Sequence, residues 1–255
     1  SRGNQHLIAD GMVSGDKTMP ITIPSFKAYD VRGRLPDQLN EDIAYRIGNA
    51  AAQFLDAKRM VLGRDIRLSS ASLADAVAKG LIDAGVEVLD IGVGGTEMVY
   101  FATGSLDADG GIMVTASHNP KDYNGLKLVR EGARPLSADS GLAQIREFAE
   151  ADARHVSAEP GRRIETPISE QYIAHLLGYV ELEKLRPLKI VANAGNGGAG
   201  PTLDLLAEHL PFEFVRVHHE ADGNFPNGVP NPMLEANRKS TAQAVRDAGA
   251  DFGIA

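Results

Sequence analysis

Strand-like and helix-like segments alternate along most of this 255-residue chain, and this alternation limits the fold more than any other feature. Short apolar runs of strand length are followed by stretches whose apolar residues recur at helical spacing. Such alternation predicts α/β layers around a parallel or mixed sheet. The predicted helices cover residues 40–55, 69–84, 96–106, 137–150, 168–180, 199–210 and 235–248. The predicted strands cover residues 60–63, 86–91, 111–115, 126–129, 188–192, 212–217 and 251–255.

Capping side chains are predicted at the start of two of the helices. Asn40 precedes the first of them and Thr96 opens the third. Asparagine and threonine side chains accept hydrogen bonds from the free amides of a first helical turn. We therefore expect both side chains to act as helix caps.

Changes in composition divide the chain into three parts. Residues 1–24 have no clear period, and we expect an extension or cloning remnant without a role in the fold. A first domain over residues 25–155 and a second over 156–255 follow, because residues 151–166 lack periodicity and are typical of a connection between domains. Residues 251–255 form an apolar run typical of a buried strand, and no residue follows them. We therefore expect the second domain to be incomplete at its C-terminus.

The bulk composition bounds the classes of partner. With 26 basic and 34 acidic residues, the formal net charge of −8 disfavours nucleic-acid binding through a broad basic surface. The absence of cysteine excludes disulfides and thiolate metal sites and fits a reducing compartment. No apolar stretch has the length of a membrane span. We expect a cytoplasmic globular protein that binds neither nucleic acid nor membrane.

The most informative motif is Thr115-Ala116-Ser117-His118-Asn119-Pro120, directly after the apolar run at 111–114. A serine hydroxyl at the end of a strand, flanked by polar groups, predicts a nucleophile. The structural alternative is a turn in which Asn119-Pro120 merely ends the strand. Neighbouring side chains on an extended backbone point to opposite sides, so His118 is not expected to deprotonate Ser117. The Gly-x-Ser-x-Gly elbow of many serine hydrolases is missing.

A phosphorylated Ser117 fits its surroundings better than an acylated one. A phosphoserine needs donors and cations nearby, and Asn119, His118 and Lys127 can supply them. Asn124-Gly125 is a strong hairpin signal, so the strand that contains Lys127 should return beside the serine motif. The alternative for Lys127 is a solvated lysine on a strand.

Three further loops carry weaker signals. In residues 26–33, Arg32 stands before a glycine and suits bidentate contact with phosphate, and Tyr29 offers a hydroxyl, although surface Arg-Gly turns are common. Asp65 and Arg67 follow a predicted strand on the same sheet edge as Ser117. A structural ion pair that holds loops is preferred for them over a catalytic role. The glycine-rich turn at 195–200 could hold an anion, but tight packing is the preferred interpretation.

Together these segments resemble the α-D-phosphohexomutase superfamily, specifically its bacterial phosphomannomutase/phosphoglucomutase branch. The resemblance runs from about residue 25 to residue 255 and rests on residues 27–33, 63–65, 115–120, 122–127, 195–197 and 222–227. It implies a four-domain protein, of which this chain would contain two consecutive three-layer α/β domains with mixed sheets, the second one truncated.

The resemblance also implies an activity. Phosphorylated Ser117 would give its phosphoryl group to a hexose phosphate, and the 1,6-bisphosphate would turn around and return its other phosphate to Ser117. The net reaction interconverts the 1- and 6-phosphates of mannose, glucose or both. The implied catalytic residues are Ser117, His118, Lys127 and Arg32, and the implied substrate-binding residues are Tyr29, Arg32, Asn119 and Lys127.

A magnesium ion belongs to the same expectation. Mg²⁺ would bind an oxygen of the Ser117 phosphate together with aspartates of a loop expected just after Ala255, so the 255 residues alone are expected to be inactive. Phosphoglucosamine mutases share the Ser-His-Asn-Pro core, but residues 128–135 look more like the mannose/glucose branch. The remaining alternatives are a non-catalytic phosphosugar-binding module and, last, a serine hydrolase, for which no His–Asp pair is evident.

Overall fold

A seven-stranded mixed sheet forms the centre of the first domain in the computed structural model, which describes residues 18–255. Its strands are β1 (Val31–Arg34), β2 (Arg59–Arg64), β3 (Glu87–Val93), β4 (Gly110–Val114), β5 (Tyr123–Arg130), β6 (Arg134–Pro135) and β7 (Arg163–Glu165). The order is β1-β5-β4-β2-β3-β7, with β6 paired to β5. Strands β4, β2, β3 and β7 are parallel, whereas β5 runs antiparallel to both β4 and β1.

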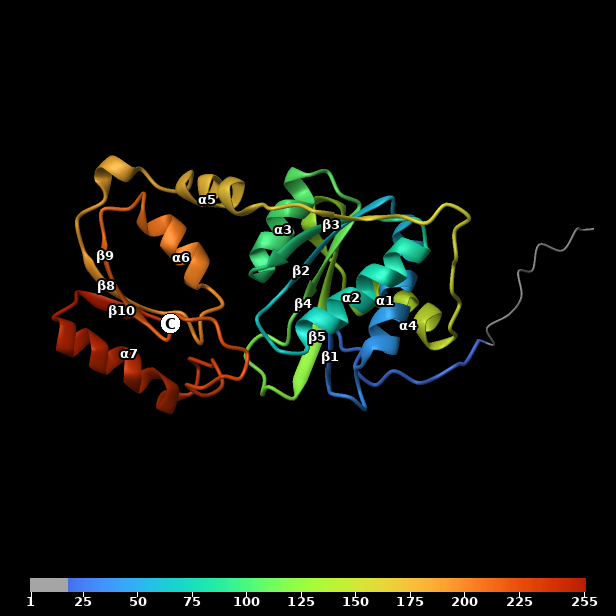
Figure 1. Ribbon diagram of the computed structural model, residues 1–255, viewed down its shortest axis with the longest axis horizontal. Helices are drawn as coiled ribbons and strands as arrows, with labels where there is room; N and C mark the ends of the chain where they lie inside the picture. The colour runs from blue at the N-terminus through green and yellow to red at the C-terminus, as the bar shows by residue number, and fades with distance from the viewer. Residues whose placement is uncertain (1–17) are drawn as a thin grey trace, which may run out of the picture.

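Helices cover both faces of this sheet, which gives the three layers predicted from the sequence (Figure 1). These helices are α1 (Glu41–Leu55), α2 (Ser70–Asp83), α3 (Thr96–Ser105) and α4 (Leu142–Glu150). One core, which includes Ile47, Leu73 and Ile145, lies beneath α1, α2 and α4. A second core, which includes Val99 and Met113, lies beneath α3. All five residues of β4 are buried, so its carboxyl end is rigidly placed.

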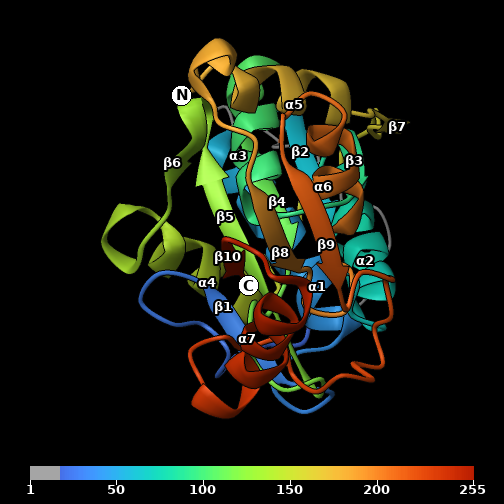
Figure 2. The same cartoon turned by 90° about the vertical axis from the view of Figure 1, so that its left-hand side faces the viewer.

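The second domain is built on a parallel sheet with the order β10-β8-β9. Helices α6 and α7 lie on opposite sides of it, and α5 lies near α3 of the first domain (Figures 1 and 2). The elements are α5 (Ser169–Leu177), β8 (Lys189–Asn193), α6 (Gly200–Ala207), β9 (Glu213–Val217), α7 (Glu235–Ala248) and β10 (Phe252–Ile254). Two consecutive α/β domains were predicted, and the structure confirms this class.

The expectation that the N-terminal residues have no role in the fold is wrong for residues 18–24. The side chain of Ile23 is fully buried in the first core. The amide of Ile21 donates to the carbonyl of Glu150 at 2.9 Å, and the amide of Ile23 donates to its carboxylate at the same distance. Glu150 therefore fastens this segment to the end of α4. The expectation for residues 1–17 lies outside the described residues.

Two other expectations fail at the edges of the sheets. No strand was predicted in the connection at 151–166, but it contains β7, which pairs with β3. The amides of Ser157 and Gly161 donate to carbonyls at the end of α2, and these bonds place the segment beside β3. Strand β10 forms as predicted, but it lies at the edge of its sheet, and Phe252 and Ile254 are 43% and 49% exposed rather than buried.

Local capping moves the start of α4. The prediction began this helix at Ser137, but the Ser137 and Ser140 side chains form a capping box around a single 3₁₀ turn (Ala138–Ser140), so the α-helix begins only at Leu142. Two further 3₁₀ turns cover Glu131–Ala133 and Leu182–Lys184.

Of the two predicted helix caps, only Asn40 forms the capping hydrogen bond. Replacing the two residues should therefore destabilise the first domain by different amounts. Asn40 Oδ1 accepts from the Ile43 amide at 3.0 Å, as expected, whereas α3 is capped by Gly95 and the Thr96 side chain makes no capping bond. Asn40→Ala should lower the free energy of unfolding of the first domain by about 1 kcal/mol. Thr96→Ala should change it by less than about 0.5 kcal/mol. Urea titration tests the pair, and equal losses in both variants would contradict this assignment.

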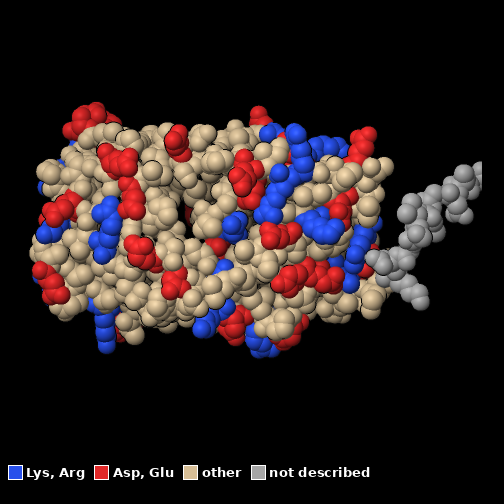
Figure 3. Space-filling view, in the orientation of Figure 1, with Lys and Arg blue, Asp and Glu red and all other residues tan. Residues whose placement is uncertain are grey.

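The described part of the chain contains no helix that is both long and apolar enough to cross a membrane. On the face shown in Figure 3, basic and acidic side chains are interspersed over both domains. Neither sign of charge dominates this face, although the sequence as a whole has a formal net charge of −8.

Candidate active site at the end of strand β4

A short loop at the carboxyl end of β4 presents Ser117. The Thr115 hydroxyl donates to Asp65 Oδ2 at 2.7 Å and accepts from the Ser117 amide at 2.9 Å, which turns the chain away from the strand. Ser117 has a φ of 54°, in the left-handed region, and its side chain is exposed. The hydroxyl therefore stands at the end of a buried strand on a backbone with a defined, uncommon conformation.

His118 lies closer to Ser117 than the sequence suggested. Ser117 Oγ and His118 Nδ1 are 3.1 Å apart, which is hydrogen-bond distance. The expectation that the two side chains diverge assumed an extended backbone, and the left-handed conformation of Ser117 removes that assumption. The imidazole can therefore exchange a proton with the serine hydroxyl.

The buried Arg67 side chain binds the backbone of the Ser117 loop. Its Nη1 donates to the carbonyls of Pro120 and Tyr123 at 2.8 and 3.0 Å, and its Nη2 donates to those of Ser117 and Asn119 at 3.0 and 2.7 Å. The residue is only 4% exposed. One planar guanidinium thus fixes four carbonyls of the loop, which a lysine could not do.

Asp65 balances the buried charge of Arg67. The Asp65 carboxylate lies 3.3 Å from Arg67 Nε and also accepts from the Ser70 hydroxyl at 2.5 Å. Burial lowers the pKa of Arg67, and the charge of Asp65 opposes this effect. The predicted structural ion pair is confirmed. The prediction that this pair holds loops is also confirmed, and the structure shows that the loop bound by Arg67 is the one that contains Ser117.

A second polar group flanks the loop and contains both predicted cations. Arg32 on β1 donates to Asn119 Oδ1 at 2.8 Å and to Asp30 Oδ2 at 2.7 Å. Lys127 Nζ on β5 lies 3.5 Å from the same Asp30 oxygen. The four side chains, of Asp30, Arg32, Asn119 and Lys127, are all partly buried. The structure therefore brings Asn119, Arg32 and Lys127 together, with Asp30 as the shared counter-ion of the two cations Arg32 and Lys127.

The chain returns beside the serine motif as predicted, but the turn is not formed by Asn124-Gly125. Asn124 and Gly125 lie within β5, where they pair with Gly33 and Arg32 of β1, and the turn is formed by residues 115–122. Asn124 is fully buried, and its amide donates to the hydroxyls of Ser69 and Ser70. The hairpin signal failed because this asparagine satisfies its amide inside the domain. Lys127 nevertheless lies opposite Met113 of β4, beside the serine loop as expected.

Tyr29 stands apart from these groups. Its side chain is 80% exposed, and its hydroxyl makes no hydrogen bond within residues 18–255. The loop that carries it is tied to the domain through the Ala28 carbonyl, which accepts from the Ala138 amide at 2.8 Å. The structure therefore does not bring Tyr29 into contact with Ser117.

Reasoning from the sequence missed Asp30 and Asn124 and underestimated Arg67. Arg67 follows β2, whereas Asp30 and Asn124 stand at the beginning of β1 and β5. For Arg67 and Asn124 the signal was their place beside a predicted strand, because the ends of neighbouring strands meet at one edge of a sheet. No strand was predicted at residues 31–34, so Asp30 carried no such signal.

The described residues do not provide a metal site. No group of three or more histidine, aspartate or glutamate side chains within residues 18–255 is arranged to hold a metal ion. A magnesium ion prefers six oxygen ligands, several of them from carboxylates or phosphates. Residues 18–255 therefore do not by themselves make up the magnesium site implied by the resemblance.

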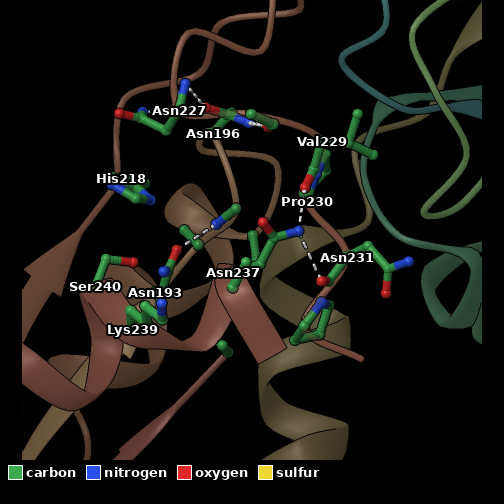
Figure 4. A pocket seen from close by; sticks show the side chains of 17 residues that line it. Asn193, Asn196, His218, Asn227, Val229, Pro230, Asn231, Asn237, Lys239 and Ser240 are labelled. Carbon is green, nitrogen blue, oxygen red and sulfur yellow. Dashed lines mark hydrogen bonds between the residues drawn. The ribbon is translucent and has the colours of Figure 1, made fainter. Parts of the chain in front are cut away.

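Two cavities lie near the carboxyl ends of the strands. One of about 170 Å³ lies between the domains and is lined by Thr115, Ser117, Gly198 and Phe225, among others. A larger one of about 560 Å³ lies in the second domain (Figure 4), and its walls carry five asparagines: Asn193, Asn196, Asn227, Asn231 and Asn237.

The glycine-rich turn serves packing, as preferred from the sequence. A Cβ atom at Gly197 would collide with the backbone of Glu220 and Ala221. Beside it, the buried Asn196 side chain accepts from the Asn227 amide and donates to the Gly228 carbonyl. The turn is thereby joined to the loop at residues 222–228.

Comparison with known proteins identifies the family. The family model for phosphoglucomutase/phosphomannomutase α/β/α domain I matches residues 24–155, and that for domain II matches residues 170–255. The chain is 59% identical to a protein of Xanthomonas campestris pv. campestris named "Phosphohexose mutases" over 92% of its own length, and 56% identical to a phosphomannomutase of Salmonella typhimurium over 90%.

A solved structure supports the same relationship. A phosphoglucomutase/phosphomannomutase family protein from Burkholderia thailandensis is 35% identical, with a TM-score of 0.84 over 92% of this chain and 52% of its own. The chain likewise spans 52% of both curated relatives, about half of their length. These matches cover both α/β domains and the Ser117 loop, and the chain therefore belongs to the phosphoglucomutase/phosphomannomutase family of phosphohexomutases.

Proposed function

We propose that the protein containing these residues interconverts hexose 1-phosphates and hexose 6-phosphates, of mannose, glucose or both, with Ser117 as the phosphoryl carrier. The observation that carries this proposal is the exposed Ser117 hydroxyl, held on the Arg67-bound loop beside Arg32 and Lys127. Relatives named phosphomannomutase and phosphohexose mutases support the class of substrate.

The proposed chemistry is two transfers between oxygen atoms. In the first, a hydroxyl of a hexose monophosphate attacks the phosphorus of phosphorylated Ser117, a P–O bond to the sugar forms, and the bond to Ser117 Oγ breaks. In the second, Ser117 Oγ attacks the other phosphate of the resulting hexose 1,6-bisphosphate, the bond from that phosphorus to the sugar oxygen breaks, and Ser117 is phosphorylated again. The sugar hydroxyl loses a proton in the first transfer and another hydroxyl regains one in the second, so the cycle is balanced.

The surrounding residues are assigned roles by their chemistry. His118, at 3.1 Å from Ser117 Oγ, can hold the proton of the serine when it carries no phosphoryl group. Arg32 and Lys127 offer positive charge to the transferred phosphoryl group, and Asn119 offers an amide, as transfer by positioning and charge neutralisation requires. Tyr29 is exposed enough to meet a bound sugar. The requirement for magnesium stays a prediction from the family resemblance.

Substrate preference is tested with three sugars. The protein, assayed at the full length of its relatives, is offered mannose, glucose and glucosamine 1-phosphates, and formation of each 6-phosphate is followed. We expect turnover of mannose or glucose 1-phosphate at least tenfold faster than that of the glucosamine compound. Preference for glucosamine 1-phosphate would move the protein to the phosphoglucosamine mutase branch. Binding of all three without turnover would indicate a phosphosugar-binding module.

A further inference from the structure

The Arg67 guanidinium that binds the serine loop also touches the second domain. Its two terminal nitrogens donate to the four loop carbonyls, and its Nε lies 3.3 Å from the Asp65 carboxylate. Arg67 Cζ also lies over the ring of Phe225, in the second domain, 5.2 Å from the ring centroid. Phe225 is only 8% exposed. The contact is therefore a desolvated cation–π pair across the two domains.

Phe225 is held firmly by its own domain. Its carbonyl accepts from the Gly228 amide at 3.0 Å and its amide donates to the Asp222 carbonyl at 3.2 Å, so the ring sits in a tight turn. Asn196, 1% exposed, binds both ends of that turn through its carbonyl and its side chain. The position of the ring therefore follows the position of the second-domain sheet, from which the Asn196 turn begins.

The turn at residues 222–228 also contacts the first domain at a second place, through Gly223. A Cβ atom at Gly223 would collide with the carbonyl oxygen of Ile66 and would lie 3.0 Å from the amide of Leu68. Only a glycine permits this approach between the two backbones. The turn at 222–228 thus contacts residues 66–68 on both sides of Arg67, and a shift of one loop displaces the other.

We propose that Phe225 is a positioning residue for phosphoryl transfer. By packing against the Arg67 guanidinium, the ring fixes the position of that group, and hence the positions of the four carbonyls that Arg67 binds and the direction in which Ser117 is presented. The expected effect on kcat rests on the proposed function. The expected effect of Phe225 on the order of the Ser117 loop does not. A residue of the second domain, Phe225, would thus help to orient the nucleophile of the first domain, Ser117.

The test compares variants that distinguish the aromatic character of the Phe225 side chain from its apolar volume. Phe225→Leu keeps an apolar side chain without the aromatic face, and Phe225→Tyr keeps the face. Leu68→Ala is the control, because Leu68 meets the same turn but is 67% exposed and makes none of the Arg67 bonds. Amide hydrogen exchange of residues 116–123 is measured in each variant, together with kcat and KM for the hexose 1-phosphate that the unaltered protein turns over.

Phe225→Leu should speed exchange in residues 116–123 and lower kcat by about tenfold, the effect of losing one desolvated cation–π contact, while KM changes little. Phe225→Tyr and Leu68→Ala should retain normal exchange and kcat. Unchanged protection of β8 and α6 shows that the second domain of the leucine variant is folded. If β8 loses protection, Phe225→Met takes its place with the same expectations.

Unchanged exchange of residues 116–123 in Phe225→Leu would overturn the proposal, and so would equal losses in Leu68→Ala. These results are distinct from a failure of the proposed function. If the unaltered protein turns over no hexose phosphate, the mutase assignment fails, while the exchange measurement still decides whether Phe225 positions the loop.

Discussion

Replacing Ser117 with alanine is expected to abolish the interconversion of hexose 1- and 6-phosphates. The variant removes the oxygen to which the phosphoryl group is proposed to be attached, and loss of a nucleophile typically lowers kcat by roughly 10⁴-fold or more. The fold should survive, because within residues 18–255 the Ser117 side chain makes a single hydrogen bond, to His118. Its backbone bonds to Thr115 and Arg67 do not depend on the side chain.

A matched control is available in Ser105, an exposed serine at the end of α3. Ser105→Ala should leave the rate of interconversion unchanged. Both variants are assayed at saturating hexose phosphate with added magnesium and with the 1,6-bisphosphate as activator. Turnover by Ser117→Ala within tenfold of the unaltered protein would exclude Ser117 as the carrier.

The second large effect is expected at Lys127. Its ammonium shares the Asp30 carboxylate with Arg32 beside the serine loop, so it is placed to offer charge to the transferred phosphoryl group. Lys127→Met keeps the length of the side chain and removes the charge. Loss of one fixed electrostatic partner of a transition state typically costs about 10²–10³ in kcat. We therefore expect kcat to fall by about that factor while Ser117 can still be phosphorylated.

Lys121→Met provides the control for general electrostatics. Lys121 lies in the Ser117 loop and is exposed, so this variant removes the same charge from the same region. Solvent screens such a charge, and kcat should change less than about threefold. Equal losses in the two variants would show that the overall positive charge matters and that Lys127 has no specific role.

The architecture was largely predictable because it depends on periodicity. Fully buried strands such as β4 and amphipathic helices such as α1 have patterns that the sequence displays directly. The misplaced features depend on partners distant in the chain. The Ile23 segment is fastened by Glu150, and β7 is positioned by carbonyls at the end of α2, and neither partner can be read from local composition.

The candidate site shows the same division. Ser117, Arg32 and Lys127 were predicted from motifs, and the structure places them around one loop. The closeness of His118 to Ser117 depends on one left-handed φ angle, which local sequence did not reveal. The contact between Phe225 and Arg67 depends on two domains meeting, and residues 158 positions apart in the chain give no shared pattern.

The most direct test of the central claim follows the phosphoryl group itself. The protein is incubated with hexose 1,6-bisphosphate labelled in its phosphates, and the labelled peptide is mapped before and after treatment with acid. Acid is needed because Ser117 and His118 are neighbours, and phosphoserine is stable to acid whereas phosphohistidine is not. We predict one acid-stable label on Ser117. An acid-labile label on His118, or a label on no residue of this loop, would contradict the account.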